Sequence, residues 1–598
     1  MKIKISDYIA KFIEKKRIKH IFGVTGGGAM HLNDSFGKSK KIKFIFFHHE
    51  QAASMAAEAY FRVHNLPCLL HTTSGPGATN AITGVTGAWI DSIPMIVISG
   101  QVPKKDMINK SKTRQIGVQE INITDIVKPI TKYSKVLTKP HEVDIVLNEA
   151  FEKMISDKPG PVWIDIPLDI QSSYVELKRI KKFKKKLKNK KIVKINYKKI
   201  LDEVNKSKKP LIIIGNGIHL SNSTVEFKRF LKMLKIPVIS SWNASDIIST
   251  SNNLYVGRMG IFGERTSNLA VESSDLLIIL GTRLSIPQTG YVKKNFSPNS
   301  KKIFVDIDRN EMNAKEFSNF LLKLNIDLKY FLKGAITFIK NKKIKKFYSW
   351  TNLILDWKKK YSVVENKHSL DNKFINSFDF IDILSKNLKG NETIVTDMGT
   401  SFTCTMQSFN IKKPLKQRLF TSSGLASMGF GLPGIIGAYF ADNKKKPICI
   451  SGEGGLMFNL QELQTIKNYS IPLKLFIIEN KGYLTMKLMQ KKNFKRIVGA
   501  DPKSGVTFPS FKKLADTFKF EYIKIQNNKI LEHLKKVLKS KRPVIAEVNL
   551  HPYQELVPRI QNRLNKDGTF MVPKFDDLYP HLSEEKLNYE RLRAKKIK

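Results

Sequence analysis

The chain has 598 residues, of which 41% are hydrophobic, and it carries a formal net charge of +51. Its length allows about three to five domains of ~100–200 residues each, and its longest apolar runs are far shorter than the ~20 residues of a membrane-spanning helix. The lysines are scattered through every segment and are not interleaved with aromatic residues that stack on bases, so we expect neither a membrane partner nor a specific nucleic-acid partner.

The start of the chain and its cysteines indicate the compartment. The basic stretch at 1–20 precedes no apolar segment and no small-residue cleavage site, so we expect no signal peptide. Cys68, Cys404 and Cys449 lack the spacing of metal ligands, which fits a reducing cytoplasm.

Apolar strands alternate with helical stretches through the first part of the chain. We expect a helix rich in small residues at 51–63, and strands at 41–47, 68–73, 94–100 and 162–169. Such alternation is typical of a parallel sheet that is covered on both faces.

The same alternation returns twice, and basic stretches separate the units. We therefore predict an α/β fold of three doubly wound parallel-sheet domains. The predicted boundaries are an N-terminal domain at 1–172, a basic linker at 173–195, a central domain at 196–345, a linker at 346–371, a C-terminal domain at 372–555 and a tail at 556–598. The dense lysine run at 176–194 fits a solvated linker; the alternative is a site for a polyanion.

The third unit contains the strongest local motif. A strand runs into Gly452-Glu453-Gly454-Gly455 and then a helix, and the next strand ends at Asn480, 27 residues after Glu453. A carboxylate and an amide oxygen at two strand ends, beside a helix N-terminus, suit a diphosphate held through a hard divalent cation. The alternative is an ordinary strand–glycine turn–helix, because glycine loops alone are weak signals.

This segment resembles the thiamine-diphosphate motif, in which a GDG triplet lies upstream of a pair of asparagines. Glu453 stands in place of the aspartate, Glu479 in place of the first asparagine, and Asn480 matches the second. The resemblance implies thiamine diphosphate and Mg²⁺ as cofactors, with Glu453, Asn480 and the backbone carbonyl of Gly482 as metal ligands. Because glutamate is one methylene longer than aspartate, either the cation or the loop must shift.

Long segments in the first and third units resemble acetohydroxyacid (acetolactate) synthases and occur in the same order as in this family. The segments are 46–62, 71–84, 93–103, 151–167 and 420–438. The resemblance implies a pyrimidine-binding N-terminal domain, a central domain and a diphosphate-binding C-terminal domain.

Glu50 ends a predicted strand and opens the helix rich in small residues. From its position it is either a solvent-facing helix cap or a catalytic carboxylate. The resemblance favours catalysis: a carboxylate hydrogen-bonds the aminopyrimidine ring and stabilises the imino tautomer, whose nitrogen removes the thiazolium proton. In this family the site lies between the first domain of one subunit and the third domain of its partner, which implies a homo-oligomer with a dimer as the minimum.

The resemblance assigns further residues to the site. Gln101 and Gly27 join Glu50 as catalytic residues near the substrate. The cofactor-binding residues are Thr400, Ser401, Ala426, Met428, Gly452, Gly454, Gly455 and Asn480. Polar turns, core packing or tight strand–helix turns are the structural alternatives for these positions. His48 and His49 either shuttle protons or simply pack and cap the helix.

Glycines and polar residues also follow strands of the central unit, where some family members hold a flavin. These are Gly215, Asn216, Gly217, Gly281, Thr282, Arg283 and Asp306. FAD is therefore a candidate cofactor, and a vestigial domain is the alternative; no arginine occurs at 195–200, where flavin-binding relatives often have one.

The implied reaction is that of a 2-oxo acid carboligase, which decarboxylates pyruvate and transfers the two-carbon unit to an acceptor carbonyl, as in branched-chain amino acid biosynthesis. The alternatives are a related enzyme with a keto-sugar or aldehyde acceptor and a catalytically inactive subunit, against which the intact Glu50 argues. Family synthases carry an arginine about four residues after Arg283 that pairs with the acceptor carboxylate. Here that position is Pro287, and Lys293 and Lys294 nearby would select poorly, so we expect a weaker preference for 2-oxo acid acceptors.

Overall fold

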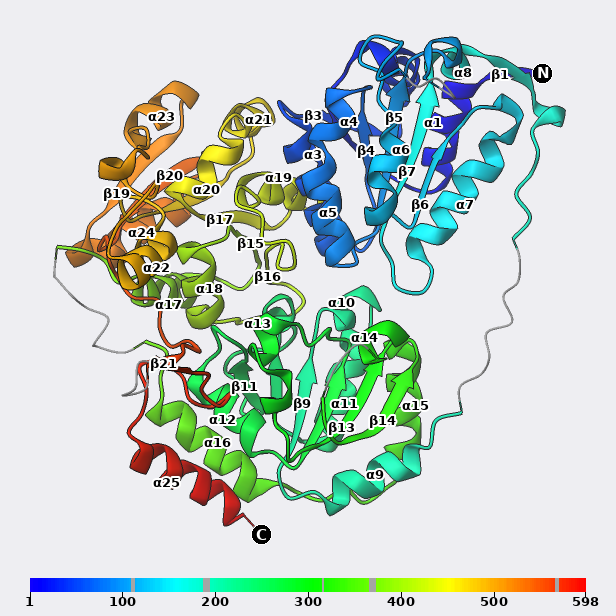
Figure 1. The fold of residues 1–598 in the computed structure, drawn as a ribbon. Helices are drawn as coiled ribbons and strands as arrows, with labels where there is room; N and C mark the ends of the chain where they lie inside the picture. Colours follow the sequence, from blue (N-terminus) through cyan, green and yellow to red (C-terminus); the bar gives the residue numbers. More distant parts are fainter. Residues whose placement is uncertain (109–112, 186–193, 314–316, 365–372, 565–568, 598) are drawn as a thin grey trace.

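Three six-stranded parallel sheets organise the chain in a computed structural model (Figure 1). The structure describes residues 1–598 except 109–112, 186–193, 314–316, 365–372, 565–568 and 598. Residues 186–193 of the basic run at 176–194 thus lie outside the described residues. Each sheet lies inside one of the three ranges predicted for a domain, and the predicted fold class is confirmed. No helix of the described part is long and apolar enough to cross a membrane.

The first and third sheets share one topology. The first has the order β3 (Lys43–Phe46), β2 (His20–Gly23), β4 (Leu69–Thr72), β5 (Met95–Gln101), β7 (Pro161–Pro167), β6 (Tyr133–Val136). The third has the order β16 (Arg418–Phe420), β15 (Glu392–Thr396), β17 (Lys446–Gly452), β18 (Lys474–Glu479), β20 (Val544–Asn549), β19 (Glu521–Ile525). In both, the strand order reverses between the first and third strands of the domain, which is where ligands bind in open α/β sheets.

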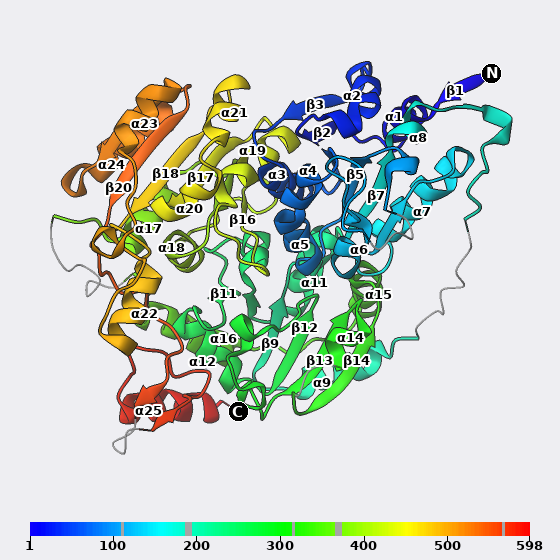
Figure 2. The ribbon, with the colours of Figure 1, turned by 45° about the horizontal axis from the view of Figure 1, so that its top comes forward.

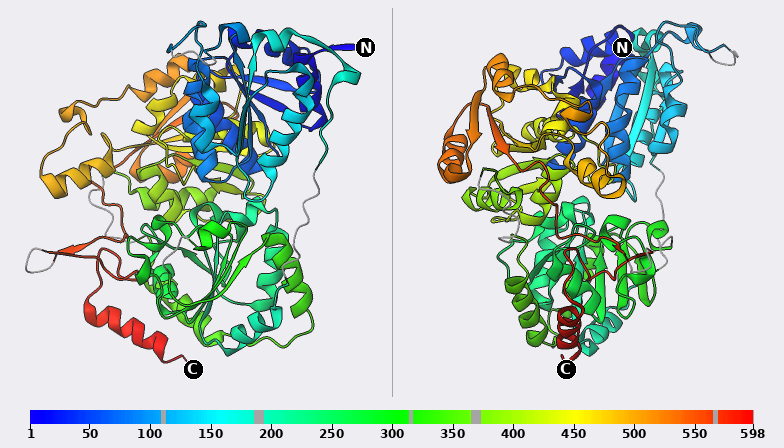
Figure 3. Two further views of the ribbon diagram at one scale, coloured as in Figure 1. Left: turned by 45° about the vertical axis from the view of Figure 1, so that its right-hand side comes forward. Right: turned by 60° about the vertical axis from the view of Figure 1, so that its left-hand side comes forward.

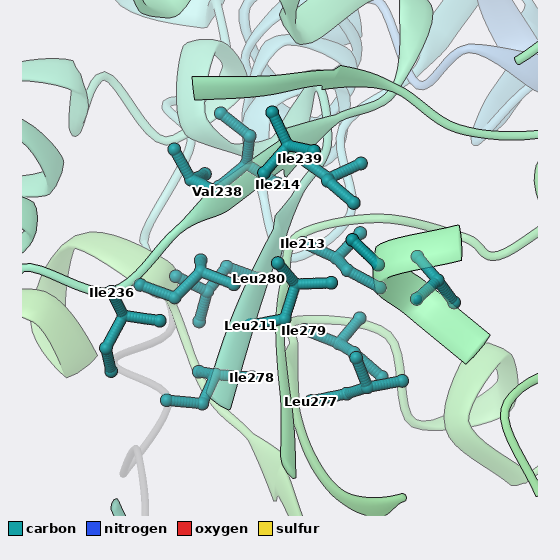
Figure 4. Packing of buried hydrophobic residues seen from close by; sticks show 14 of the residues in the cluster. Leu211, Ile213, Ile214, Ile236, Val238, Ile239, Leu277, Ile278, Ile279 and Leu280 are labelled. Carbon is teal, nitrogen blue, oxygen red and sulfur yellow. The ribbon is translucent and has the colours of Figure 1, made fainter. Parts of the chain in front are cut away.

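The central sheet has a different order, that of a dinucleotide-binding fold. Its strands run β11 (Tyr255–Arg258), β10 (Val238–Ser240), β9 (Pro210–Ile214), β12 (Leu276–Leu280), β13 (Lys301–Asp306), β14 (Phe320–Asn325). The middle strands are continuous runs of buried Ile and Leu because helices cover both faces of the sheet (Figure 4).

Helices flank each sheet on both sides (Figure 2). Those of the first unit are α1 (Ile5–Lys15), α2 (Met30–Gly37), α3 (Glu50–His64), α4 (Pro76–Asn80), α5 (Ile82–Ile90), α6 (Ile123–Val127), α7 (Val143–Ile155) and α8 (Leu168–Ser172). Those of the central unit are α9 (Tyr197–Lys206), α10 (Gly217–Leu220), α11 (Thr224–Leu234), α12 (Arg265–Ser273), α13 (Ile286–Thr289), α14 (Arg309–Asn313) and α15 (Leu328–Ile339). Those of the third unit are α17 (Ser377–Asn387), α18 (Thr400–Ser408), α19 (Gly431–Ala441), α20 (Glu453–Leu456), α21 (Glu462–Asn468), α22 (Leu484–Phe494), α23 (Phe511–Phe518) and α24 (Ile530–Lys539).

The N-terminal and C-terminal units pack directly on each other through α3 and α19 (Figure 2). Both helices are rich in small residues, and a Cβ added at Gly437 would lie 2.0 Å from the carbonyl oxygen of Ala56. The backbones therefore approach more closely than larger side chains allow. One apolar cluster runs continuously across the contact.

The predicted linker at 346–371 and the predicted tail at 556–598 differ from expectation in their packing. Residues of the first form α16 (Tyr348–Lys360), whose Trp350 and Trp357 are fully buried in the core of the central domain. The tail crosses to the same core and ends in α25 (Glu584–Lys595), which is red in Figure 3. It lies beside α16, and its Glu590 accepts a hydrogen bond from Trp357 (Figure 1). Both segments are rich in exposed lysines, which dilute the apolar residues in the sequence, so composition alone suggested connecting segments.

Charged side chains join the three domains at one buried junction. Arg62 donates to Glu58 and to Asp91, and Arg283 of the central domain donates to Asp91 from the other side. The backbone N–H of Ser423 in the C-terminal domain also donates to Asp91, at 3.0 Å. A buried acid with this many donors fixes the three units relative to one another.

Candidate active site

A cavity of about 1140 Å³ opens at the carboxyl ends of the third sheet. Nine of the predicted cofactor and metal residues line it. They are Thr400, Ala426, Met428, Gly452, Glu453, Gly454, Gly455, Asn480 and Gly482. Residues that are up to 82 positions apart in sequence thus meet at one place, between the ends of strands β15, β17 and β18.

Two helices begin at this cavity with their backbone N–H groups unsatisfied by side chains. The nine-residue helix α18 starts after Gly399, which has φ of +84° and no side-chain cap, and α22 starts after Tyr483, also without a side-chain cap. Gly399, Thr400, Tyr483 and Leu484 all line the cavity. Free N–H groups at helix starts and the positive end of the helix dipole favour a bound anion such as a diphosphate.

The Glu453 carboxylate bridges the loop that follows β18. Its two oxygens accept the backbone N–H groups of Asn480, at 2.9 Å, and of Gly482, at 2.6 Å. Burial raises the pKa of Glu453 to about 7, although these N–H groups lower it. The extra methylene of glutamate thus lets one side chain reach both N–H groups.

The side chain of Asn480 has an unsatisfied hydrogen-bond acceptor. Among the described residues its side-chain Oδ1, which is buried, has no hydrogen-bond partner, and its Nδ2 makes only a 3.5 Å contact with Thr400 Oγ1. An unpartnered buried acceptor costs about 1–3 kcal/mol, so native proteins rarely retain one without a reason. Asn480 and Glu453 both line the cavity.

These residues fit a hard cation that is shared with phosphate oxygens. The described residues contain no group of three or more His, Cys, Asp or Glu side chains that would hold a metal without help. One carboxylate, one amide oxygen and a carbonyl leave positions for phosphate and water, which is the pattern that Mg²⁺ prefers. Gly482 has φ of +137°, and a Cβ there would meet the Ala500 carbonyl oxygen at 2.1 Å, so only glycine fits.

Two supporting residues went unnoticed in the sequence. Asp397, fully buried at the end of β15, accepts from the N–H groups of Met398 and Gly429 and from the Ser451 hydroxyl, so it holds three cavity segments together. Lys487, only 1% exposed, donates to the Asn480 carbonyl at 2.8 Å. An aspartate after a strand and a lysine in a lysine-rich chain carry no distinguishing signal.

The remaining predicted cofactor residues differ in their placement. Ala426 has φ of +60°, a left-handed conformation that costs a residue with a Cβ about 1–2 kcal/mol, and such strain is typical of functional loops. Met428 lines the cavity. Ser401 does not: its hydroxyl donates to the carbonyls of Asp397 and Met398, so it fastens the start of α18.

Glu50 lies at the first position of α3, with only 8% of its surface exposed. Asn80 Nδ2 donates to Glu50 Oε2 at 3.0 Å, and Gly77 leaves room for Oε1, which a Cβ there would meet at 3.2 Å. The His49 side chain caps the helix by accepting the Gln51 N–H, which confirms the capping alternative for that histidine. Asn80 is a positioning residue that the sequence did not single out.

Glu50, Gln101 and Gly27 are not among the described residues that line the cavity of the same chain. Gln101 is buried, and its amide contacts Asp165, the Ile121 carbonyl and the Val102 N–H within its own domain. A Cβ at Gly27 would meet nothing within 4 Å, so this one position of the loop faces open space. The structure therefore gathers the diphosphate half of the predicted site and leaves the pyrimidine half on a separate surface.

A smaller cavity of about 330 Å³ lies at the switch point of the central sheet. Gly217, Gly281 and Asp306 line it, as predicted for a flavin. Both of its cationic side chains are already engaged: Arg283 with Asp91, and Lys158 with Asp308 and Glu311.

The two glycine turns that flank the smaller cavity approach each other closely. A Cβ at Gly215 would lie 2.2 Å from the Gly281 carbonyl oxygen, which explains these glycines without a ligand. The cavity is at the small end of the ~300–1,000 Å³ range of ligand sites, and its cations among the described residues are paired with protein acids, so FAD stays a prediction.

Comparisons with known proteins agree with this arrangement. Residues 3–125, 197–333 and 397–548 match the N-terminal TPP-binding, central and C-terminal TPP-binding domains of thiamine pyrophosphate enzymes. The probable acetolactate synthase large subunit of Methanococcus aeolicus is 31% identical over 92% of each chain. The acetolactate synthase isozyme 1 large subunit of Escherichia coli is 28% identical over 93% of this chain and 95% of its own, and the large subunit of Buchnera aphidicola from Schizaphis graminum is 32% identical over 91% and 93%. The chain therefore belongs to the thiamine pyrophosphate enzyme family and has all three of its domains in order.

Proposed function

We propose that this chain is an acetolactate synthase-like carboligase, which decarboxylates pyruvate and joins the two-carbon unit to an acceptor carbonyl. The observation that carries the proposal is that Glu453 and Asn480 line one large cavity, and that the buried Oδ1 of Asn480 has no partner among the described residues. Relatives named as acetolactate synthase large subunits, aligned over more than nine tenths of the chain, support this reaction over other chemistry of the family.

The residues divide the work between the two ends of the cofactor. Glu453, Asn480 and the Gly482 carbonyl would hold Mg²⁺, and the starts of α18 and α22 would hold the diphosphate. When bound, thiamine diphosphate supplies a thiazolium carbon that serves as nucleophile and electron sink. Glu50, at the first position of α3, would hydrogen-bond the aminopyrimidine ring and stabilise its imino tautomer.

We further propose that two copies of the chain share each site. The support is that Glu50, which accepts from Asn80 and packs against Gly77, does not line the cavity of its own chain. A second copy would bring its Glu50 to that cavity, so a homodimer is the minimum active unit, and we place it in the cytoplasm. The catalytic roles of Gln101 and Gly27 remain part of this proposal.

A related carboligase with a different acceptor is the second candidate. The specific observation in its favour is Pro287, which lines the cavity where the family's synthases carry an arginine. Proline offers neither charge nor a donor.

Product analysis tests the proposal. The purified chain would be incubated with thiamine diphosphate, Mg²⁺ and pyruvate, with and without 2-oxobutyrate or an aldehyde. We expect pyruvate consumption, release of CO₂ and a new carbon–carbon bond, which is acetolactate when pyruvate is both donor and acceptor. Failure to consume pyruvate under any of these conditions would refute the assignment.

A further inference from the structure

Part of the C-terminal tail forms a wall of the main cavity. Leu556 and residues 559–562 line it together with the glycine loops and helix starts described above, and so do Lys492 and Asn493 at the end of α22. None of the predicted cofactor residues lies in this part of the lining. The tail therefore adds side chains to the substrate space beyond those that hold a diphosphate.

The tail reaches the place where the family's arginine is missing. The N–H of Ile261 donates to the Pro287 carbonyl at 2.8 Å, and the N–H of Ile560 donates to the Ile261 carbonyl, also at 2.8 Å. A Cβ at Gly290 would lie 3.5 Å from Ile560 Cδ1, so the loop after Pro287 packs against the same tail residue. Two backbone hydrogen bonds thus connect Pro287 through Ile261 to Ile560, and Arg559 directly precedes Ile560 in the chain.

Arg559 is held in place but keeps most of its donors for a ligand. Its backbone pairs in both directions with Tyr579, at 3.0 and 2.7 Å. Within the described part of the chain its guanidinium makes one hydrogen bond, from Nη2 to Gln561 Oε1 at 2.9 Å, and no ion pair. Burial lowers the pKa of Arg559 from its ordinary value, and the nearby Glu555 carboxylate opposes this effect. An arginine side chain is effectively always protonated in proteins.

A second cation, the exposed Lys492, lines the same cavity as Arg559. Burial lowers the pKa of Lys492, and the nearby positive charge of Arg559 lowers it further. The carboxylate of Glu555 opposes both effects only in part, and its oxygens lie 3.4 and 3.5 Å from the Tyr579 hydroxyl. Two cations that line one cavity repel each other, and a bound anion would offset that repulsion.

We propose that Arg559, assisted by Lys492, binds an anionic group of the acceptor and takes the place of the arginine that the family's synthases carry at Pro287. This inference rests on the proposed carboligase function. The acceptor is then a carbonyl compound with a carboxylate or a phosphate group, because a guanidinium pairs with either through two parallel hydrogen bonds. The sequence pattern at Pro287 predicted a weaker preference for charged acceptors; the tail restores the missing charge.

Matched acceptors test the assignment. Initial rates would be measured with pyruvate as donor and with two pairs of acceptors: 2-oxobutyrate against propanal, and glyceraldehyde 3-phosphate against glyceraldehyde. The variants are Arg559→Gln, Arg559→Lys and, as a control of equal charge change, Arg496→Gln, whose parent residue is exposed and does not line the cavity.

We expect Arg559→Gln to raise the KM for the charged member of one pair by roughly 10- to 100-fold, as loss of a charged hydrogen bond implies, and to leave the neutral member unchanged. Arg559→Lys should restore part of the loss, and Arg496→Gln should behave like the parent. The pair that responds identifies the anion as carboxylate or phosphate.

Equal effects on charged and neutral acceptors would overturn the inference, as would unchanged KM values for both charged acceptors. Release of CO₂ from pyruvate without an acceptor separates this outcome from a failure of the proposed function. If the parent chain releases none, the carboligase assignment fails. If Arg559→Gln raises the KM of that donor reaction as much as the KM of the acceptor, the residue binds the donor and the acceptor role is wrong.

Discussion

Replacement of Asn480 by alanine should separate the stability of the free chain from its response to cofactor. In the free chain, the Asn480 Oδ1 is buried without a partner, and the Nδ2 contact at 3.5 Å is too long to contribute much. Truncation to alanine removes the cost of burying this unpartnered oxygen, about 1–3 kcal/mol, and loses only the weak Nδ2 contact, which is worth well under about 1 kcal/mol. Because the side chain borders an open cavity, no sealed void is created, so the free energy of unfolding should stay the same or rise by up to about 2 kcal/mol.

The loaded chain should respond in the opposite way. Binding stabilises a protein by RT ln(1 + [L]/Kd), so each tenfold loss of affinity removes about 1.4 kcal/mol at saturating ligand. Urea unfolding of the parent and Asn480→Ala, each with and without Mg²⁺ and thiamine diphosphate, measures both effects. Asn468→Ala, a change at an exposed asparagine of α21 outside the cavity, is the control. If Asn480→Ala kept the full cofactor-dependent stabilisation of the parent, Asn480 would not be a ligand of the metal.

Three other predictions follow from the same geometry. Glu453→Asp should keep activity at saturating Mg²⁺, because the ligand type is unchanged, but the free chain should lose about 1 kcal/mol in urea unfolding since the shorter side chain cannot reach the N–H groups of both Asn480 and Gly482. Burial and nearby lysines lower the pKa of His20 from 6.5 to about 4, so its contribution to stability is complete above about pH 6.5 and is lost as pH falls toward 4. The free energy of unfolding of His20→Gln should therefore fall less between pH 6.5 and 4 than that of the parent, by at most about 3 kcal/mol. An unchanged slope would contradict the shift. Inactive Glu50→Gln and Asn480→Ala chains, mixed and allowed to exchange subunits, should regain roughly a quarter of parental activity, because half of the dimers are hybrids with one intact site; no recovery despite exchange would place both residues in the same chain's site.

The sequence predicted the sheets because their strands are buried on both faces and read as unbroken apolar runs. It also predicted that Glu453 and Asn480 lie together, since they follow neighbouring parallel strands and must meet at one edge of the sheet. Local periodicity and strand order were enough for these features.

Other features depend on contacts between distant segments. Arg559 and Lys492 are two of many basic residues in the sequence, and only the folded tail brings them to the cavity wall beside Pro287. The helix at 348–360 reads as part of a basic connector because its lysines are exposed while Trp350 and Trp357 face the central core. Neither spacing nor composition specifies such long-range packing.

The central claim is that Glu50 activates the cofactor of this chain, and the most direct measurement is the rate at which the thiazolium proton of bound thiamine diphosphate exchanges with D₂O. Acid-quenched samples of the parent and of Glu50→Gln, both saturated with Mg²⁺ and cofactor, would be followed by proton NMR. We predict that exchange in the parent is faster by ~100-fold or more, the usual scale of general acid–base catalysis, while both proteins unfold at the same temperature. Equal exchange rates in two folded, cofactor-saturated proteins would contradict the account.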